Sequence, residues 1–503
     1  MASSTIPLLL DNQPVITADT FDVISPNTGA VVYKCSSTSV AHAVRAVDSA
    51  NAAFKSWAKV KPSARRDIFL KVIEIYERRK EELIGYAQEE TGSTRMFAEF
   101  NWGLGHNLLK DVTGRTLSTA GTVPVMRDEG QSGIVYKEPY GVILSIAPWN
   151  AMFVLGLRSI VLPLAAGNTV VLKASELSPK CFWALGDIFR EAQLPPGCLN
   201  VLYHRPASAA EITTALIAHP AIRKINFTGS TQVGRIIAST AGKYIKPVLL
   251  ELGGKASTIV LDDADLKKAA TGCVMGSFLH VWLDPLFVPW SLPTFKDTKE
   301  SLLTDRVGGQ ICMSTERIIV QRSVIDEFRN HLRETMATSN SNPPPVLVSA
   351  APVIKNRNLV SNAVSKGGNI LVGDNISTEE TPNNTRMDPI ILEGITPDMD
   401  IYHTESFGPT VSLYVVDTEQ EAIQLANDTE YGLSAAVYTE NLGRGLRVAK
   451  QLESGAVHIN SMTVHDEPGL PHGGVKCSGF GRFGGPAALD EFLTTKSVTW
   501  MDV

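Results

Sequence analysis

The feature that most constrains the fold is an alternation of strand-like and helix-like segments, which begins at Gly141 and continues to Asn460. Short apolar runs such as 169–173 and 411–416 have the length of buried strands, and amphipathic stretches such as 419–427 separate them. Strands that alternate with helices form a mainly parallel sheet with helices on both faces. The sequence therefore predicts an α/β protein.

Local signals refine this prediction on either side of Gly141. Amphipathic helices are expected over 41–57 and 62–91, and Ser208 with Glu211 has the spacing of a capping box for the helix that reaches Ala218. With 503 residues the chain is too long for one hydrophobic core, so two or three domains are expected.

The composition excludes several classes of function. A hydrophobic share of 44%, a charged share of 19% and a net charge of -6 leave no basic surface for nucleic acid or an anionic membrane. The most apolar window, 152–167, carries Arg158 and Pro163 and is too short for a membrane span, which indicates a buried helix. No targeting signal is evident, so a cytoplasmic location is expected.

Cysteine and histidine spacing gives no sign of a metal. The six cysteines form no CxxC pair and the ten histidines no HExxH, so neither a zinc site nor a disulfide framework is expected. Free cysteines in a large chain suit a reducing compartment.

Cys312 and Glu251 are candidates for covalent chemistry. Gly309 precedes the cysteine and leaves its thiol reachable, although a buried structural cysteine is the alternative. Glu251 follows the strand 247–250 and can act as a general base if burial raises its pKa. An ion pair with Lys255 is the alternative for this carboxylate.

Three further segments follow predicted strands. Asn150 can donate to a developing oxyanion or, alternatively, cap the next helix. Residues 227–234 have the Gly-x-x-x-x-Gly form of a phosphate cradle, a weak signal by itself. Lys173 and Glu176 can bind ribose hydroxyls or lie in a solvated loop.

Together these segments resemble, in order and spacing, the landmarks of the aldehyde dehydrogenase superfamily. The landmarks are PWN (148–150), KASE (173–176), FTGSTQVG (227–234), ELGGK (251–255), GQICMSTERI (309–318), ESFGP (405–409) and PHGGVKCSGFGRFGG (471–485). The resemblance implies a Rossmann-like NAD-binding domain, an α/β catalytic domain and a β-ribbon oligomerisation element. Their expected extents are 1–121 with 139–252, 253–470, and 122–138 with 486–503, in a homodimer or homotetramer.

The same resemblance implies the chemistry of an aldehyde substrate. The Cys312 thiolate attacks the aldehyde carbon, Asn150 and the Cys312 backbone N–H hold the oxyanion, and Glu251 activates water to release a carboxylic acid. The implied cofactor is NAD, because the charge of Glu176 repels the additional phosphate of NADP. The implied cofactor-binding residues are Lys173 and Glu176 at the adenosine ribose, Gly229, Ser230 and Gly234 at the pyrophosphate, and Glu405 and Phe407 at the nicotinamide ribose.

Residues 150–158 resemble the aromatic-aldehyde branch, which includes salicylaldehyde, benzaldehyde and vanillin dehydrogenases. The salicylaldehyde type carries an arginine at the place of Arg158, which implies a bond to a ring hydroxyl and a preference for ortho-hydroxylated benzaldehydes. A structural ion pair is the alternative for Arg158. A catabolic role and a step in secondary metabolism both stay open.

Residues 281–307 depart from the family, in which the preceding helix runs almost directly into the GQxC motif. About 27 residues are extra, and they interrupt the α/β pattern shortly before Cys312. They indicate either a gene-model artefact, such as an unspliced intron, or a true insertion at the site. The alternatives to an active dehydrogenase are therefore an impaired or non-catalytic homologue, and a thiol hydrolase that uses Cys312 without a cofactor.

Overall fold

The computed structural model describes residues 5–278, 308–338, 344–373 and 384–502. Its first large sheet has eight strands in the order β19-β11-β10-β7-β8-β9-β2-β3. The five strands from β11 to β9 are parallel, and the outer strands pair in antiparallel fashion. The strands are β2 (Leu8–Leu10), β3 (Gln13–Val15), β7 (Val142–Ile146), β8 (Thr169–Lys173), β9 (Leu199–Leu202), β10 (Ile222–Thr228), β11 (Val248–Glu251) and β19 (Gly479–Phe480).

The order of the parallel strands is that of a doubly wound dinucleotide-binding fold. Numbered along the chain from β7 to β11, they lie side by side as 5-4-1-2-3, so the order reverses between β7 and β10. In such sheets the crevice outside the carboxyl ends of the strands at this reversal receives the ligand. The Rossmann-like prediction is therefore confirmed, and the fold itself points to the ends of β7 and β10.

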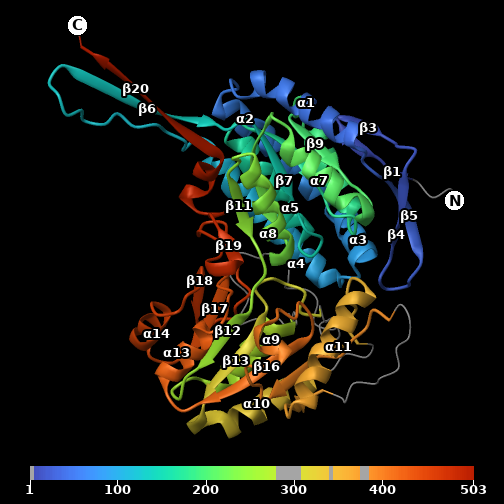
Figure 1. Cartoon of the computed structure of the whole chain (residues 1–503), viewed down its shortest axis with the longest axis vertical. Helices are drawn as coiled ribbons and strands as arrows, with labels where there is room; N and C mark the ends of the chain where they lie inside the picture. Colours follow the sequence, from blue (N-terminus) through green and yellow to red (C-terminus); the bar gives the residue numbers. More distant parts are fainter. Residues whose placement is uncertain (1–4, 279–307, 339–343, 374–383, 503) are drawn as a thin grey trace.

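A second sheet of seven strands forms the lower lobe in Figure 1, in the order β14-β15-β16-β13-β12-β17-β18. All neighbours in it are parallel except β14 with β15. Its strands are β12 (Ala256–Val260), β13 (Thr315–Gln321), β14 (Asn369–Val372), β15 (Ile390–Glu393), β16 (Thr410–Val416), β17 (Ser434–Tyr438) and β18 (Ala456–Ile459). The predicted α/β class is confirmed in both lobes.

Helices cover the sheets, and α5 (Met152–Ala165) is buried along its whole length. This is the buried helix predicted from the apolar window. No helix within the described ranges is long and apolar enough to cross a membrane. The other helices are α1 (Val40–Trp57), α2 (Pro62–Arg78), α3 (Lys80–Thr91), α4 (Arg95–Arg115), α6 (Pro179–Glu191), α7 (Ala209–Ala218), α8 (Thr231–Lys243), α9 (Leu266–Phe278), α10 (Ile325–Thr338), α11 (Ala350–Ser365), α12 (Asp400–His403), α13 (Glu419–Asn427) and α14 (Leu442–Ala449).

Two local predictions are wrong. The helix expected over 62–91 is divided at Arg79, whose guanidinium bonds Glu82 and Asp187, so α2 and α3 are separate. Ser208 makes no side-chain cap, because it ends a 3₁₀ turn with ψ near 0° and lacks the extended backbone that an N-cap residue needs.

A two-stranded ribbon stands away from the body at the upper left of Figure 1. It pairs β6 (Gln131–Pro139) with β20 (Leu493–Met501) along their full lengths. The apolar side chains of Val498, Trp500 and Met501 are exposed on β20. A third sheet, in the order β1-β5-β4, lies near the N-terminus and comprises β1 (Thr5–Ile6), β5 (Val31–Ser36) and β4 (Thr20–Ile24).

The predicted insertion at 281–307 lies outside the described residues. The described chain stops at Phe278 at the end of α9 and resumes at Gly308, four residues before Cys312.

Candidate active site

A cavity of about 360 Å³ lies between the two large sheets, and several predicted site residues line it together. Its volume is within the range of small-molecule sites, roughly 300–1,000 Å³. The first sheet contributes the loops after β7 and β10 and the end of β11, and the second contributes the segments before β13 and β16. The predicted residues on its wall are Asn150, Gly229, Ser230, Glu251, Cys312, Glu405 and Phe407.

Cys312 and Glu251 meet in this cavity. The thiol of Cys312 donates a hydrogen bond to Oε1 of Glu251 over 3.2 Å. Burial and the neighbouring Glu251 carboxylate hold the pKa of the Cys312 thiol well above its usual value. The resting cysteine is therefore a thiol with a carboxylate beside it that can accept its proton.

The carboxylate of Glu251 is 1% exposed but remains ionised. Burial alone raises its pKa, yet His472, Arg158 and the Cys312 thiol together outweigh burial and lower the pKa to about 2. The expectation of a raised pKa is therefore wrong. The alternative of an ion pair with Lys255 is also wrong, because the ammonium of Lys255 lies 2.6 Å from Glu316.

Asn150 places its amide beside the cysteine. Its Nδ2 donates to the carbonyl of Gln310 over 3.1 Å, and its side chain does not cap α5, whose N-cap residue is Ala151. The capping alternative is wrong. The amide is fixed against the turn that carries Cys312, where a donor can reach an oxyanion on the substrate.

Gly309 explains how Cys312 reaches this position. Its φ is +68°, and a Cβ atom there would lie 2.6 Å from the carbonyl oxygen of Gly408. Only glycine adopts this conformation with the ESFGP backbone so close. The turn that follows is closed by a hydrogen bond from the Ile311 N–H to the Gly309 carbonyl over 2.9 Å.

Glu316 organises the ESFGP segment, and the sequence reasoning missed this residue. Its carboxylate pairs with Lys255 and accepts from the backbone N–H groups of Ser406, at 2.8 Å, and Phe407, at 3.1 Å. Phe407 has a φ of +48°, which a bulky side chain adopts only when its surroundings enforce it. A charged residue within the apolar strand 315–321 was the available signal, since buried charges need partners.

Glu405 of the same segment also lies on the cavity wall. Its Oε1 accepts from the backbone N–H of Gly254 over 2.9 Å. Burial and the nearby Glu316 raise the pKa of Glu405 to about 7.

The phosphate-cradle segment has its predicted form at the start of α8. Ser230 is the N-cap residue and accepts from the N–H of Val233, and with Gly229 it lies on the cavity wall. Gly234 does not reach the cavity; it packs beneath it, where a Cβ atom would lie 2.4 Å from the side chain of Leu252. A helix N-terminus that opens onto a cavity in this way binds phosphate well.

Lys173 and Glu176 lie outside the wall of the large cavity. Lys173 ends β8, next to β7, and Glu176 follows three residues later. Burial lowers the pKa of Lys173, and Glu176 partly offsets this effect. Both residues lie one strand away from the reversal in strand order, at the edge of the crevice.

A smaller cavity of about 40 Å³ lies on the other side of the cysteine. Asn150, Glu251 and Cys312 line both cavities. The smaller one is otherwise mostly apolar and aromatic, with Phe97, Phe100, Leu104, Val154, Leu155, Ile311, Met313 and Val464 on its wall, and with Arg158, Asp466 and His472 as its charged or titratable groups.

Arg158 forms a buried ion-pair system in the smaller cavity. Its Nη1 donates to Oε2 of Glu251 over 3.1 Å, and its Nη2 donates to Asp466. The guanidinium lies over the ring of Phe483, 5.0 Å from the centroid. Its Nε is buried and has no hydrogen-bond partner in the described part of the chain.

The geometry combines a dinucleotide-binding type of fold with a buried cysteine and carboxylate that lie between a larger cavity and a smaller, mostly apolar one. The described ranges contain no group of three histidine, cysteine or acidic side chains arranged to hold a metal ion. The profile of the aldehyde dehydrogenase family matches residues 15–281 and 305–498, and the chain belongs to this family.

Individual relatives cover almost the whole chain. A vanillin dehydrogenase from Pseudomonas fluorescens is 39% identical over 98% of this chain and 97% of its own. A crystal structure of a salicylaldehyde dehydrogenase from Pseudomonas putida G7 complexed with salicylaldehyde has a TM-score of 0.89 and 35% identity, over 99% of this chain and 98% of that one. A betaine aldehyde dehydrogenase from Staphylococcus aureus in complex with NAD+ has a TM-score of 0.88 and 27% identity, over 99% and 95%.

This chain is therefore an oxidoreductase that acts on aldehydes, in a family that uses NAD or NADP. Residues 282–304 lie between the two matched stretches. The family profile thus omits nearly the same residues that the sequence comparison identified as extra.

Proposed function

We propose that this chain oxidises aromatic aldehydes to carboxylic acids with NAD, using Cys312, Glu251 and Asn150. The observation that carries the proposal is the 3.2 Å contact between the Cys312 thiol and Glu251, at the junction of the two cavities. An aldehyde in the apolar cavity and a cofactor in the larger one would meet at this sulfur.

Glu251 accepts the thiol proton as Sγ of Cys312 bonds to the aldehyde carbon. The Asn150 amide and the Cys312 backbone N–H then stabilise the oxyanion. When bound, NAD supplies the hydride acceptor that the protein side chains lack. The resulting thioester on Cys312 is hydrolysed by a water molecule from which Glu251 removes a proton.

The residues of the larger cavity suit a dinucleotide. The start of α8 at Ser230 offers free N–H groups to the pyrophosphate, and Glu405 and Phe407 lie where the nicotinamide ribose would bind. Lys173 and Glu176, at the edge of the crevice, would hold the adenosine ribose. The negative charge of Glu176 favours NAD over NADP, and a higher kcat/KM with NADP than with NAD would refute this preference.

The substrate class follows from the smaller cavity and from the relatives, which are named for vanillin and salicylaldehyde. The rings of Phe97 and Phe100 suit a planar aromatic substrate. Arg158 uses two nitrogens for Glu251 and Asp466, so its Nε remains to donate to an ortho oxygen of the substrate.

The preference for ortho-hydroxylated substrates is tested by comparing salicylaldehyde with benzaldehyde. The ratio of their kcat/KM values is insensitive to a loss of activity that affects both substrates equally. We expect Arg158→Ala to lower this ratio. An unchanged ratio would remove Arg158 from substrate recognition and leave it as a structural ion pair.

The overall activity is tested by NADH formation from benzaldehyde and salicylaldehyde. The full chain is compared with a variant that lacks 281–307, with Cys312→Ala as the inactive control. Activity in the full chain supports the proposal, and activity only in the shortened chain identifies an impaired form of a dehydrogenase. NAD binding without turnover in either chain would identify the non-catalytic alternative. Ester hydrolysis in the absence of NAD would identify the hydrolase alternative.

We also propose that the exposed ribbon of β6 and β20 mediates oligomerisation. It presents an apolar row on β20, and pairing of such an edge with another subunit would cover that row. A dimer or tetramer in analytical ultracentrifugation, converted to monomer by Trp500→Asp, is the expected result.

A further inference from the structure

His472 is a buried histidine that the roles proposed above leave unused. It is 6% exposed and lines the smaller cavity. Its Nε2 lies 3.8 Å from Oε1 of Glu251, the same oxygen that accepts the thiol hydrogen bond of Cys312. One carboxylate oxygen therefore lies between the nucleophile and an imidazole nitrogen.

The surrounding structure fixes the backbone of His472 near Glu251. The backbone N–H of His472 donates to the carbonyl of Phe483 over 2.6 Å, and the N–H of Phe483 donates back over 2.7 Å. The ring of Phe483 lies beneath Arg158, which holds the other oxygen of Glu251. The backbone of His472 and the carboxylate of Glu251 are thus held by neighbouring contacts. A single bridging water or a small rotation of the imidazole ring closes the 3.8 Å gap between Nε2 and Oε1.

Charged groups of both signs surround His472 in the smaller cavity. Two carboxyl groups and one guanidinium face it, so the formal charge of its partners is negative when the cysteine is a thiol. Another histidine, His458, has a pKa lowered to about 4 by burial and by the nearby His465 and His472, and so it stays neutral. The titratable and charged groups around His472 are Glu251, Arg158, Cys312, Asp466 and His458.

The proposed reaction needs a group that takes protons from Glu251. Glu251 takes one proton from the thiol and later another from water, but the surroundings that keep its carboxylate ionised make it hold a proton poorly. Imidazole exchanges protons readily between about pH 5 and 8, so it is a better acceptor than bulk water at neutral pH.

We propose that His472 is a positioning residue that relays protons from Glu251 to solvent. As Sγ of Cys312 bonds to carbon, its S–H bond breaks and the proton moves to Oε1 of Glu251. That O–H bond then breaks as an N–H bond forms at Nε2 of His472, and the imidazolium loses the proton to water. No electrons are gained or lost in these steps, and the proton from the hydrolytic water follows the same route.

This inference rests on the proposed function and is tested by His472→Gln and His472→Gly, with His465→Gln as the matched control. His465 is exposed and absent from the wall of the cavity. We expect His472→Gln to lower kcat by about tenfold while KM changes little, less than the roughly 10²–10⁴-fold loss typical of the side chain that takes the proton from the reacting group directly. The pH profile of kcat should differ from that of the unmodified enzyme in His472→Gln and match it in His465→Gln.

Chemical rescue separates a relay from a structural role. Imidazole added to the assay should restore kcat in His472→Gly but not in Cys312→Ala, because it can occupy the vacated space and accept the proton. An unchanged kcat and pH profile in His472→Gln, or a loss that imidazole does not restore, would overturn the inference. Absence of aldehyde oxidation in the unmodified enzyme would instead overturn the proposed function.

Discussion

The two large parallel sheets present opposite edges to the active-site cavity. The first sheet contributes the carboxyl ends of its strands, where Asn150 follows β7 and Ser230 follows β10. The second sheet contributes the amino ends, because Cys312 precedes β13 and Phe407 precedes β16. Open parallel sheets ordinarily bind ligands at their carboxyl ends, so only the first sheet follows this rule.

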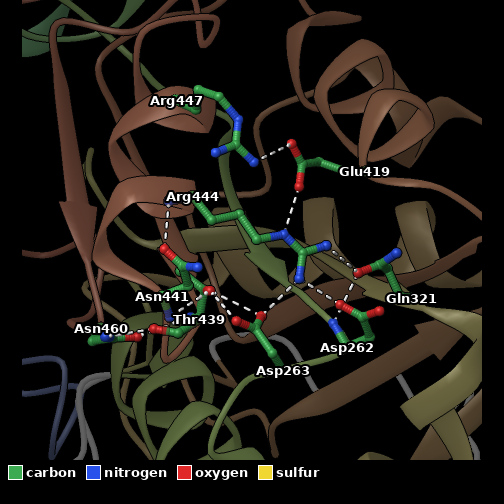
Figure 2. A network of polar contacts seen from close by, with 9 residues as sticks. All are labelled: Asp262, Asp263, Gln321, Glu419, Thr439, Asn441, Arg444, Arg447 and Asn460. Atoms are coloured by element: carbon green, nitrogen blue, oxygen red, sulfur yellow. Dashed lines mark hydrogen bonds and ion pairs between the residues drawn. The ribbon is translucent and has the colours of Figure 1, made fainter.

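The carboxyl edge of the second sheet is instead closed by an ion-pair network, shown in Figure 2. The guanidinium of Arg444 on α14 bonds Asp263 after β12 at 2.9 Å and Glu419 on α13 at 2.6 Å. It also bonds Asp262 and Gln321, which lie after β12 and at the end of β13. The comparison teaches that one edge of the second sheet is committed to stability, and its opposite edge is left for chemistry.

Among the variants that test this comparison, Glu251→Gln is expected to have the largest effect on activity. The amide cannot accept the thiol proton or activate water, so kcat should fall roughly 10²–10⁴-fold. Steady-state and single-turnover NADH formation measure the loss. Glu334→Gln, on the exposed face of α10, is the matched control and should keep full activity. Activity within threefold of the unmodified enzyme would exclude Glu251 as the base.

The elements of the fold were also unequally predictable from the sequence. Strand β8 and helix α13 have the bounds that the pattern predicts, because their apolar periodicity and terminal residues are local signals. The capping box at Ser208 and the continuous helix through Arg79 are wrong, because backbone geometry and a contact with the distant Asp187 decide them.

The same limit applies to the candidate site. Motifs indicated Cys312 and Glu251, and the structure brings them into contact across 61 positions of sequence. Sequence proximity suggested an ion pair of Lys255 with Glu251 as an alternative, yet the partner of Lys255 is Glu316. The thiol state of Cys312 and the low pKa of Glu251 also depend on burial and on distant charges, which no local pattern contains.

The second prediction concerns the proposed contribution of the amino edge of the second sheet to cofactor binding. Glu316→Gln removes the charge that pairs with the buried Lys255 and weakens the acceptor for the N–H groups of Ser406 and Phe407. We expect the Kd for NAD to rise about tenfold, equivalent to about 1.4 kcal/mol. Calorimetric titration measures it, and an unchanged Kd would mean that the ESFGP segment keeps its conformation without this clamp.

The third prediction concerns the pH dependence of kcat/KM through Glu251, which lies at the edge contributed by the first sheet. In the unmodified enzyme the pKa of Glu251 is about 2, so its carboxylate gives kcat/KM no acid limb near neutral pH. Arg158→Met removes one cation that lowers this pKa, and burial then raises it. The fraction of ionised Glu251 should fall as the pH drops, and an acid limb should move upward in the variant. Arg322→Met, on an exposed pair, is the control; coincident acid limbs in all three enzymes would contradict the prediction.

The smallest effect on catalysis is expected from Arg444→Met at the carboxyl edge of the second sheet. Asp262, Asp263 and Glu419 would lose their shared partner, but they are partly exposed, so we expect a loss of only about 2 kcal/mol in stability. Arg447→Met on the same helix is the matched control, because Arg447 is largely exposed and lies 3.8 Å from Glu419 (Figure 2). Thermal unfolding should detect a lower Tm for Arg444→Met alone, with kcat unchanged at assay temperature. A kcat that fell with Tm would show that the two edges are mechanically coupled, and the division between a stabilising edge and a chemical edge would then be wrong.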